Sequence, residues 1–158
     1  MTSWIAILIA AFVLVGCNQG GVLDGMLPHK DPAPVDFATL VRPDSPNTYL
    51  IAPAGFGAAK ADEAAPVFAI PEAQLKEKFV AMIAREPRIE LLSQSADGLQ
   101  LQYVQRTRMV RFPDIIDVRF LPLEGGRSSL ALYSRSVYGR SDLGVNKARA
   151  KAWVSATQ

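Results

Sequence analysis

The stretch IIDVRFLPLEGGRSSLALYSRSVY, residues 115–138, decides the fold of this chain. Apolar and polar side chains alternate in each half of it, as they do in a strand with one buried face. In the first half, one face is apolar and carries Ile116, Val118 and Phe120. Glu124-Gly125-Gly126 has the composition of a tight turn. The stretch therefore predicts an antiparallel β-hairpin.

More strands precede this hairpin along the chain. RIELLSQS (88–95) and LQLQYVQRTRMV (99–110) flank the turn Ala96-Asp97-Gly98, and Thr48–Ala52 reads as a short strand bounded by prolines. Residues 55–66 are rich in small side chains and are interpreted as a loop. We therefore expect an antiparallel sheet of about four strands.

Two helices are predicted beside this sheet. The first begins at Pro71, ends before Pro87, and has an apolar face of Leu75, Phe79, Met82 and Ile83. The second begins at about Val145, and we expect Val145, Ala148 and Ala152 to face the sheet, with Trp153 as an anchor. The predicted class is α+β, a two-layer sandwich formed by residues 35–158.

The amino terminus has the features of an export signal. Residues 3–16 carry no charge, and the apolar run is shorter than the ~20 residues that a membrane-spanning helix requires. Leu14-Val15-Gly16-Cys17 resembles the lipobox of bacterial lipoproteins. The resemblance implies that residues 1–16 are a signal peptide and that Cys17 is acylated. An uncleaved anchor with an incidental cysteine is the alternative.

Residues 17–34 are rich in glycine, proline and aspartate and are predicted to be a flexible tether. Cys17 is the only cysteine, so an internal disulfide is excluded. Either interpretation of the amino terminus holds the domain on a membrane of the cell envelope, facing the periplasm. Asn18 stands where lipoproteins retained in the inner membrane carry aspartate, which favours the outer membrane.

FPDIIDVRFLPLEGGRSSLALYSRSVYGRSDLGVNKAR, residues 112–149, resembles the carboxy-terminal signature of the domain-of-unknown-function family 1499 (DUF1499). Members of that family end in a strand with S-R-S-R or R-S-x-S-R, followed by G-x-S-D-x-G-V-N-[RK]-x-R. The matching positions are Phe112, Asp114, Ser134, Arg135, Ser136, Gly139, Ser141, Asp142, Gly144, Val145, Asn146 and Arg149. Val137 departs from the pattern, because many members have a second arginine there. The family has no established activity, so the resemblance implies no mechanism.

Several kinds of chemistry are disfavoured by composition. The single histidine, His29, lies in the tether, far from every serine of interest, which argues against a serine–histidine hydrolase. No cluster of Cys and His has the spacing of a zinc site, and no nucleotide-binding motif occurs, so neither a metal nor a cofactor is predicted. Asp114 is interpreted as a turn residue, and Arg119 is the expected partner of Asp117.

Charge is unevenly distributed along the chain. Residues 98–158 carry ten basic side chains and four acidic ones, although the net charge of the whole chain is only +2. This asymmetry favours an anionic partner such as lipid head groups or a surface polymer, while a solvated sheet face with paired charges is the alternative. Nucleic acid is not expected, because the interleaved aromatic and basic pattern is absent.

The junction SRSVYGRSDLGVNKAR (134–149) has two interpretations. In the first, the first amides of the last helix, Arg135 and Ser141 converge on an anion. In the second, Ser141 or Asp142 caps those amides, while Asn146 bonds back to the strand. Gly139 and Gly144 then take positive φ. Asp142 favours the second, because its carboxylate already supplies negative charge and could pair with Arg135 or Arg140. The candidate residues for either role are Arg135, Ser136, Gly139, Ser141, Asp142, Asn146 and Arg149.

The sequence thus predicts a non-catalytic envelope lipoprotein that binds a protein partner or an anionic ligand. The alternative is a hydrolase-like enzyme acting on an anionic envelope substrate, which requires Asp114, Arg135 and Asp142 to meet in one cleft. A structural accessory of an envelope complex is a third interpretation.

Overall fold

The computed structural model describes residues 32–158. The expected signal peptide, Cys17 and most of the tether therefore lie outside the described residues. The strands are β1 (Thr48–Ala52), β2 (Glu63–Ala64), β3 (Ile89–Gln94), β4 (Gln100–Arg106), β5 (Pro113–Leu123) and β6 (Arg127–Ser136). The helices are α1 (Glu72–Ile83) and α2 (Val145–Thr157), with a short 3₁₀ turn at Glu124–Gly126. No helix within residues 32–158 is long and apolar enough to cross a membrane.

The α+β class is confirmed, but the sheet is larger than expected. It has six strands in the order β2-β1-β6-β5-β4-β3, all neighbours being antiparallel except β1 and β2, which are parallel. The prediction of about four antiparallel strands was therefore too small. The addition comes from residues interpreted as loop: the amide of Asp62 donates to the carbonyl of Leu50, and that of Ala65 to Ala52.

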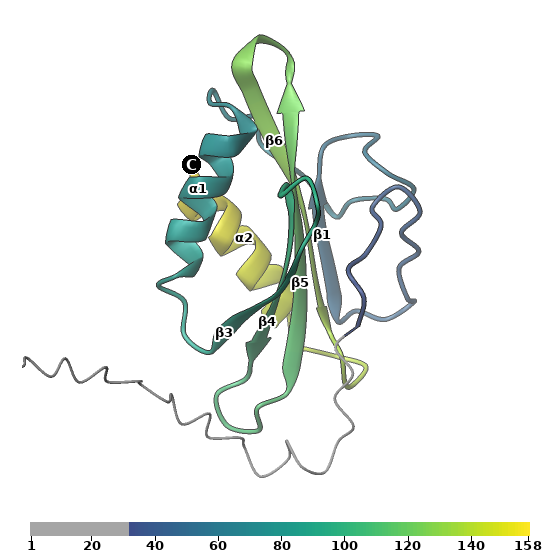
Figure 1. The fold of residues 1–158 in the computed structure, drawn as a ribbon. Coiled ribbons are helices and arrows are strands. Elements are labelled where there is room, and N and C mark those ends of the chain that lie inside the picture. Colours follow the sequence, from purple (N-terminus) through teal and green to yellow (C-terminus); the bar gives the residue numbers. More distant parts are fainter. Residues whose placement is uncertain (1–31) are drawn as a thin grey trace, which may run out of the picture.

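The central hairpin of the sheet is β5–β6, as predicted. Its register runs from Asp114 opposite Ser136 to Leu123 opposite Arg127. Gly125 and Gly126 adopt φ of 70° and 67° in the turn, a conformation that favours glycine over residues with a Cβ. The long hairpin thus spans the molecule and fixes which side chains lie at its two ends (Figure 1).

Both helices cover one face of the sheet (Figure 1). Phe79 of α1 lies at the centre of this layer, with its ring centroid 5.5 Å from Phe120 and 6.2 Å from Trp153. Trp153 is the anchor that was predicted for α2. The predicted face of α2 was wrong, since Val145, Ala148 and Ala152 are exposed and the buried residues are Asn146, Ala150, Trp153, Val154 and Thr157. The pattern of apolar residues did not indicate this face, because its first buried residue is the polar Asn146.

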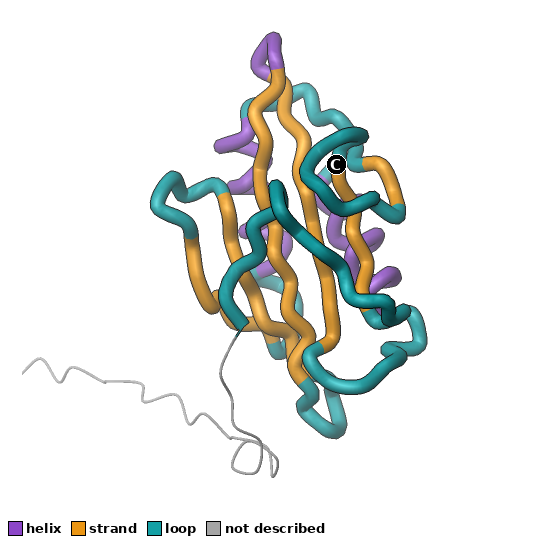
Figure 2. The backbone as a smooth tube through the Cα atoms, turned by 90° about the vertical axis from the view of Figure 1, so that its right-hand side faces the viewer, coloured by secondary structure: helices purple, strands orange, loops and turns teal. Residues whose placement is uncertain are grey.

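The opposite face of the sheet is also covered, which corrects the two-layer prediction. Residues from the irregular segments 32–47 and 53–62 cross this face (Figure 2). Phe37 and Leu40 are buried there in a second apolar cluster with Leu50, Ala131 and Tyr133. Most residues of β5 and β6 are therefore buried, on both faces of the sheet.

The loops divide between the two ends of the sheet. The β4–β5 loop (107–112) and the β6–α2 loop (137–144) lie at one end, shown at the bottom of Figure 1, and we call this the loop end. The turn at Glu124–Gly126 lies at the other end. Most of the predicted site residues belong to the loop end or to the strands that lead into it.

Candidate functional site

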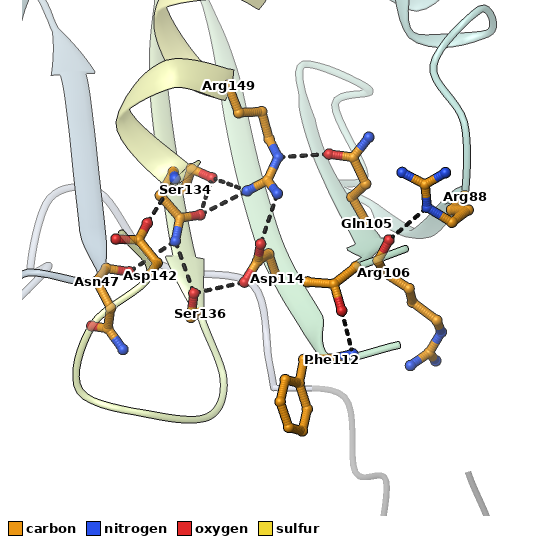
Figure 3. A network of polar contacts seen from close by, with 12 residues as sticks. Asn47, Arg88, Gln105, Arg106, Phe112, Asp114, Ser134, Ser136, Asp142 and Arg149 are labelled. Atoms are coloured by element: carbon orange, nitrogen blue, oxygen red, sulfur yellow. Dashed lines mark hydrogen bonds and ion pairs between the residues drawn. The ribbon is translucent and has the colours of Figure 1, made fainter. Parts of the chain in front are cut away.

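Arg149, on the first turns of α2, joins the helix to three strands (Figure 3). Its Nη2 donates to Asp114 Oδ2 of β5 at 2.7 Å, and its Nε donates to Gln105 Oε1 of β4 at 2.6 Å. Its Nη1 donates to Ser134 Oγ of β6 at 3.1 Å. The side chains of Arg149 and Asp114 are only 8% and 5% exposed. This is a buried, charge-assisted contact. Removal of either side chain would leave the charge of the other one buried and without its partner.

Asn146 extends the contact to β6 and to the residues before β1. Its Oδ1 accepts from Ser134 Oγ at 2.6 Å and from Arg149 Nη1 at 2.7 Å. Its Nδ2 donates to Ser136 Oγ at 2.9 Å and to the carbonyl of Asn47 at 3.0 Å. Ser136 Oγ in turn donates to Asp114 Oδ1 at 2.6 Å. We call this connected set the polar network: Asn47, Gln105, Asp114, Ser134, Ser136, Asn146 and Arg149.

The β6–α2 loop supplies the start of the helix. Asp142 Oδ2 accepts from the amide of Asn146 at 2.7 Å, and Oδ1 accepts from the amide of Gly144 at 3.0 Å. Burial opposes ionisation of Asp142, but these amide donors prevail and hold its pKa below the usual range. Ser141 Oγ accepts from the amide of Leu143 at 3.3 Å. Asp142 therefore fills the amide site that an anion would need.

The two glycines of this loop have the conformation that was predicted. Gly139 and Gly144 adopt φ of 83° and 81°. The carbonyl of Gly139 also accepts from Asn47 Nδ2 at 2.6 Å, so the loop is attached to the segment before β1. The backbone of the loop is thus fixed at both of its ends.

Arg135 lies on the other face of the sheet from the polar network. Its Nη1 donates to Asp117 Oδ2 at 2.7 Å. Asp117 is fully buried and also accepts from Gln102 Nε2 at 3.1 Å and from the amide of Val35 at 3.3 Å. Burial raises the pKa of Asp117, although Arg135 acts in the opposite direction. Arg135 therefore does not converge with Ser141 and the helix amides.

Two expectations about the aspartates of β5 were wrong. Arg119, the expected partner of Asp117, donates instead to both carboxylate oxygens of Asp97, at 3.1 and 2.6 Å. Asp114 is not a turn residue but part of β5, where it pairs with Arg149. The alternation that places Ile116, Val118 and Phe120 on the helix face also places Asp114 there, so this signal was present in the sequence.

Sequence reasoning also missed Gln105, which no motif singled out. Ser134 was noted only as a position of the family signature, and Asn47 was not among the candidate site residues. Asn146, Ser136 and Arg149 were candidates, and the structure brings these three together. Within residues 32–158 no buried side-chain nitrogen or oxygen lacks a hydrogen-bond partner. The network is therefore saturated, as a structural joint would be.

A groove opens beside the polar network, between α2, the end of β4 and the residues after α1. Its volume is about 540 Å³. Trp153 and three small side chains of α2 form an apolar wall, and Arg88, Arg108 and Arg149 supply positive charge. Glu86 is the carboxylate among the lining residues. We call this the basic groove. It was not predicted, because its residues come from three separate segments.

The buried pair predicts strong energetic coupling. Arg149→Met leaves the buried charge of Asp114 without its partner, and Asp114→Asn leaves the charge of Arg149 without its partner. Each substitution is therefore expected to lower the free energy of unfolding by about 3–5 kcal/mol. The double variant is expected to lose clearly less than the sum, because neither charge then remains. Urea unfolding measures all four proteins.

The exposed pair Arg119–Asp97 is a matched control, since its side chains are 29% and 47% exposed. Arg119→Met and Asp97→Asn are expected to lower the free energy of unfolding far less than the variants of the buried pair do, because solvent screens the exposed pair. Equal costs and equal coupling at the two pairs would contradict a special role for the buried one.

Asp142 predicts a pH-dependent contribution to stability. The pKa of Asp142 in the folded protein lies below its ordinary value of 3.8, so the stabilisation is complete above that pH and is lost as the pH falls through the folded pKa. Asp142→Ala is therefore expected to lower the free energy of unfolding by about 1 kcal/mol at pH 7. The gap between the two proteins should narrow below pH 3.8 in thermal unfolding. A gap that is constant or widens in acid would refute this role, and Ser141→Ala serves as a control without a charge.

One family model matches the part of the chain that forms this site. No curated protein matches the chain. A family model described as "Protein of unknown function (DUF1499)" matches residues 39–156, a range that includes the whole polar network and the basic groove. Since this match covers most of the chain, the resemblance of the carboxy-terminal motif is confirmed, and the chain belongs to the DUF1499 family.

Proposed function

We propose that this chain is a lipoprotein of the cell envelope whose folded domain is a non-catalytic binding module. Acyl chains on Cys17 would hold it on a membrane, facing the periplasm, and the lipobox-like Leu14-Val15-Gly16-Cys17 supports this attachment. Asn18 favours the outer membrane as its location.

The observation that carries the binding proposal is the basic groove beside a saturated network. Every polar group of Arg149 that the groove borders already has a partner within the protein, so this side chain gives shape and charge rather than reactivity. Arg88 uses Nε for the carbonyl of Arg106 at 3.0 Å, while its guanidinium lines the groove. With the indole of Trp153 as wall, the groove suits an anion that also has an apolar part.

An enzyme acting on an anionic substrate is less well supported. That alternative needs Asp114, Arg135 and Asp142 in one cleft. Asp114 and Arg135 lie on opposite faces of the sheet, each in its own ion pair. Asp142 is engaged by two backbone amides. The arrangement of these three residues therefore favours binding over catalysis.

Attachment is tested by the intact mass of the exported protein. We expect a chain that begins at Cys17 and carries acyl groups, and Cys17→Ala should prevent both cleavage and acylation. Asn18→Asp is the control, since it should keep the acyl groups and move the protein to the inner membrane. An unmodified Cys17 with residues 1–16 still present would establish the uncleaved anchor instead.

The basic groove is tested with a short-chain anionic lipid below its micelle concentration. We expect the purified protein to bind dihexanoylphosphatidylglycerol and to bind dihexanoylphosphatidylcholine more weakly. Arg108→Glu should weaken the anionic ligand by about tenfold, or about 1.4 kcal/mol. Arg127→Glu, at the opposite end of the sheet, should leave titration calorimetry unchanged. Equal binding of both lipids, or equal effects of both variants, would refute an anion site in this groove.

A further inference from the structure

Exposed apolar side chains gather at the loop end. Ten large apolar residues of the described chain are exposed, and six of them belong to residues 109–145: Met109, Val110, Phe112, Val137, Leu143 and Val145. The others, Val41, Val67, Val80 and Leu91, are spread over the rest of the domain. Met109 and Leu143 are 89% and 95% exposed, so these side chains have almost no contact with the protein. Such a concentration marks an interaction surface.

The two loops that carry these residues are adjacent. The amide of Val137 donates to the carbonyl of Pro113 at 3.2 Å, at the point where both loops leave the sheet. The rings of Phe112 and Tyr138 lie with centroids 6.1 Å apart. The six apolar residues therefore belong to one continuous end of the molecule rather than to separate surfaces.

Three residues at this end have a backbone conformation that is unfavourable for residues other than glycine. The non-glycine residues with positive φ in the described chain are Arg88, Arg111 and Leu143, and all three belong to segments at this end of the sheet. Leucine is disfavoured in the left-handed region because its Cβ crowds the backbone. Leu143 nevertheless adopts φ of 54° and gains no buried contact from it. Strain of this kind clusters at binding sites.

The charge of the two loops is positive. They carry Arg108, Arg111 and Arg140, and their one carboxylate is that of Asp142, which is bound to backbone amides. Asp114, at the start of β5, is paired with Arg149. Glu86, across the basic groove, is a further carboxylate on this side, and the exposed Asp44 lies three residues before Asn47. The surface therefore combines exposed apolar tips with guanidinium groups, the pattern of proteins that lie on anionic bilayers.

We propose that the loop end docks on a lipid bilayer with anionic head groups. Met109 and Leu143 enter the boundary between head groups and acyl chains, and the arginines bind lipid phosphates. Arg108 and Val145 line the basic groove as well, so docking places the mouth of that groove at the head groups.

This inference uses the membrane attachment proposed above only to bring the domain to the bilayer. Val35 lies 18 residues after Cys17, and a chain of that length can span about 60 Å when extended, enough for the domain to take any orientation. The amide of Val35 donates to Asp117 Oδ1 of β5 at 3.3 Å, so the tether joins the domain at this point. The anchor alone therefore leaves the orientation open, and the loop end selects one.

The test is hydrogen exchange of the full chain on vesicles, with phosphatidylglycerol in one set and phosphatidylcholine alone in the other. We expect exchange in residues 107–112 and 137–145 to slow severalfold on the anionic vesicles only. The turn Glu124–Gly126, at the opposite end, is the internal reference and should exchange as fast as in solution.

The double variant Met109→Asp, Leu143→Asp should abolish this protection without changing the melting temperature, because both side chains are exposed and aspartate tolerates the left-handed conformation. The matched control is Val67→Asp, near the opposite end, where Phe68 pairs with Ser128. In this variant the protection of residues 107–112 and 137–145 should equal that in the wild type.

The outcomes separate this inference from the anchor. Vesicle-bound chain with unprotected loops overturns docking and leaves acylation of Cys17 standing. Protected loops in a chain whose mass shows no acyl group support docking and refute the anchor. Protection in native envelopes but not on protein-free vesicles assigns the surface to a protein partner and overturns the proposal.

Discussion

The ion pair between Asp114 and Arg149 is the contact on which the carboxy-terminal half depends. It joins α2 to the central strand of the sheet, and each partner is bound by further side chains from β4, β6 and the helix. A buried pair of this kind contributes less to net stability than an apolar core would, but it tolerates few arrangements of its neighbours. Its main effect is to specify where α2 begins and how it lies.

This specification explains the family signature in physical terms. Ser134 and Ser136 alternate with Arg135 on β6, so the serines reach the helix face and the arginine reaches the other. Asn146 and Arg149 are three apart on α2, which puts both on the side facing those serines. The signature residues therefore form contacts on both faces of the sheet at one place in the fold, where β6 leads into α2.

Much of the architecture was predictable because it rests on local periodicity. The β5–β6 hairpin, both helices and the positive φ of Gly139 and Gly144 follow from patterns a few residues long. The parallel pairing of β2 was not predictable, since two residues carry no period. The layer over the second face of the sheet was missed for the same reason, because residues 32–47 and 53–62 have no regular structure.

The site was less predictable than the fold because its partners are distant in sequence. Ser136, Asn146 and Arg149 belong to the junction 134–149. Asn47, Gln105 and Asp114 join them from three other segments. The wrong partner for Asp117 has a similar origin: Arg119 lies two residues away on the same face, yet Asp97 of the β3–β4 turn holds it. The basic groove is formed by three segments that are distant in sequence, and no sequence signal points to it.

The placement of two aspartates on opposite faces of β5 also bears on how the strands find their alignment. Asp114 meets Arg149 on one side of the sheet, and Asp117 meets Arg135 on the other. If β5 slid by one residue against β6, each carboxylate would move to the wrong side and be buried without its cation. The hairpin is otherwise rich in interchangeable apolar side chains, which would tolerate such a slip. The two ion pairs thus make a misaligned pairing of β5 and β6 costly.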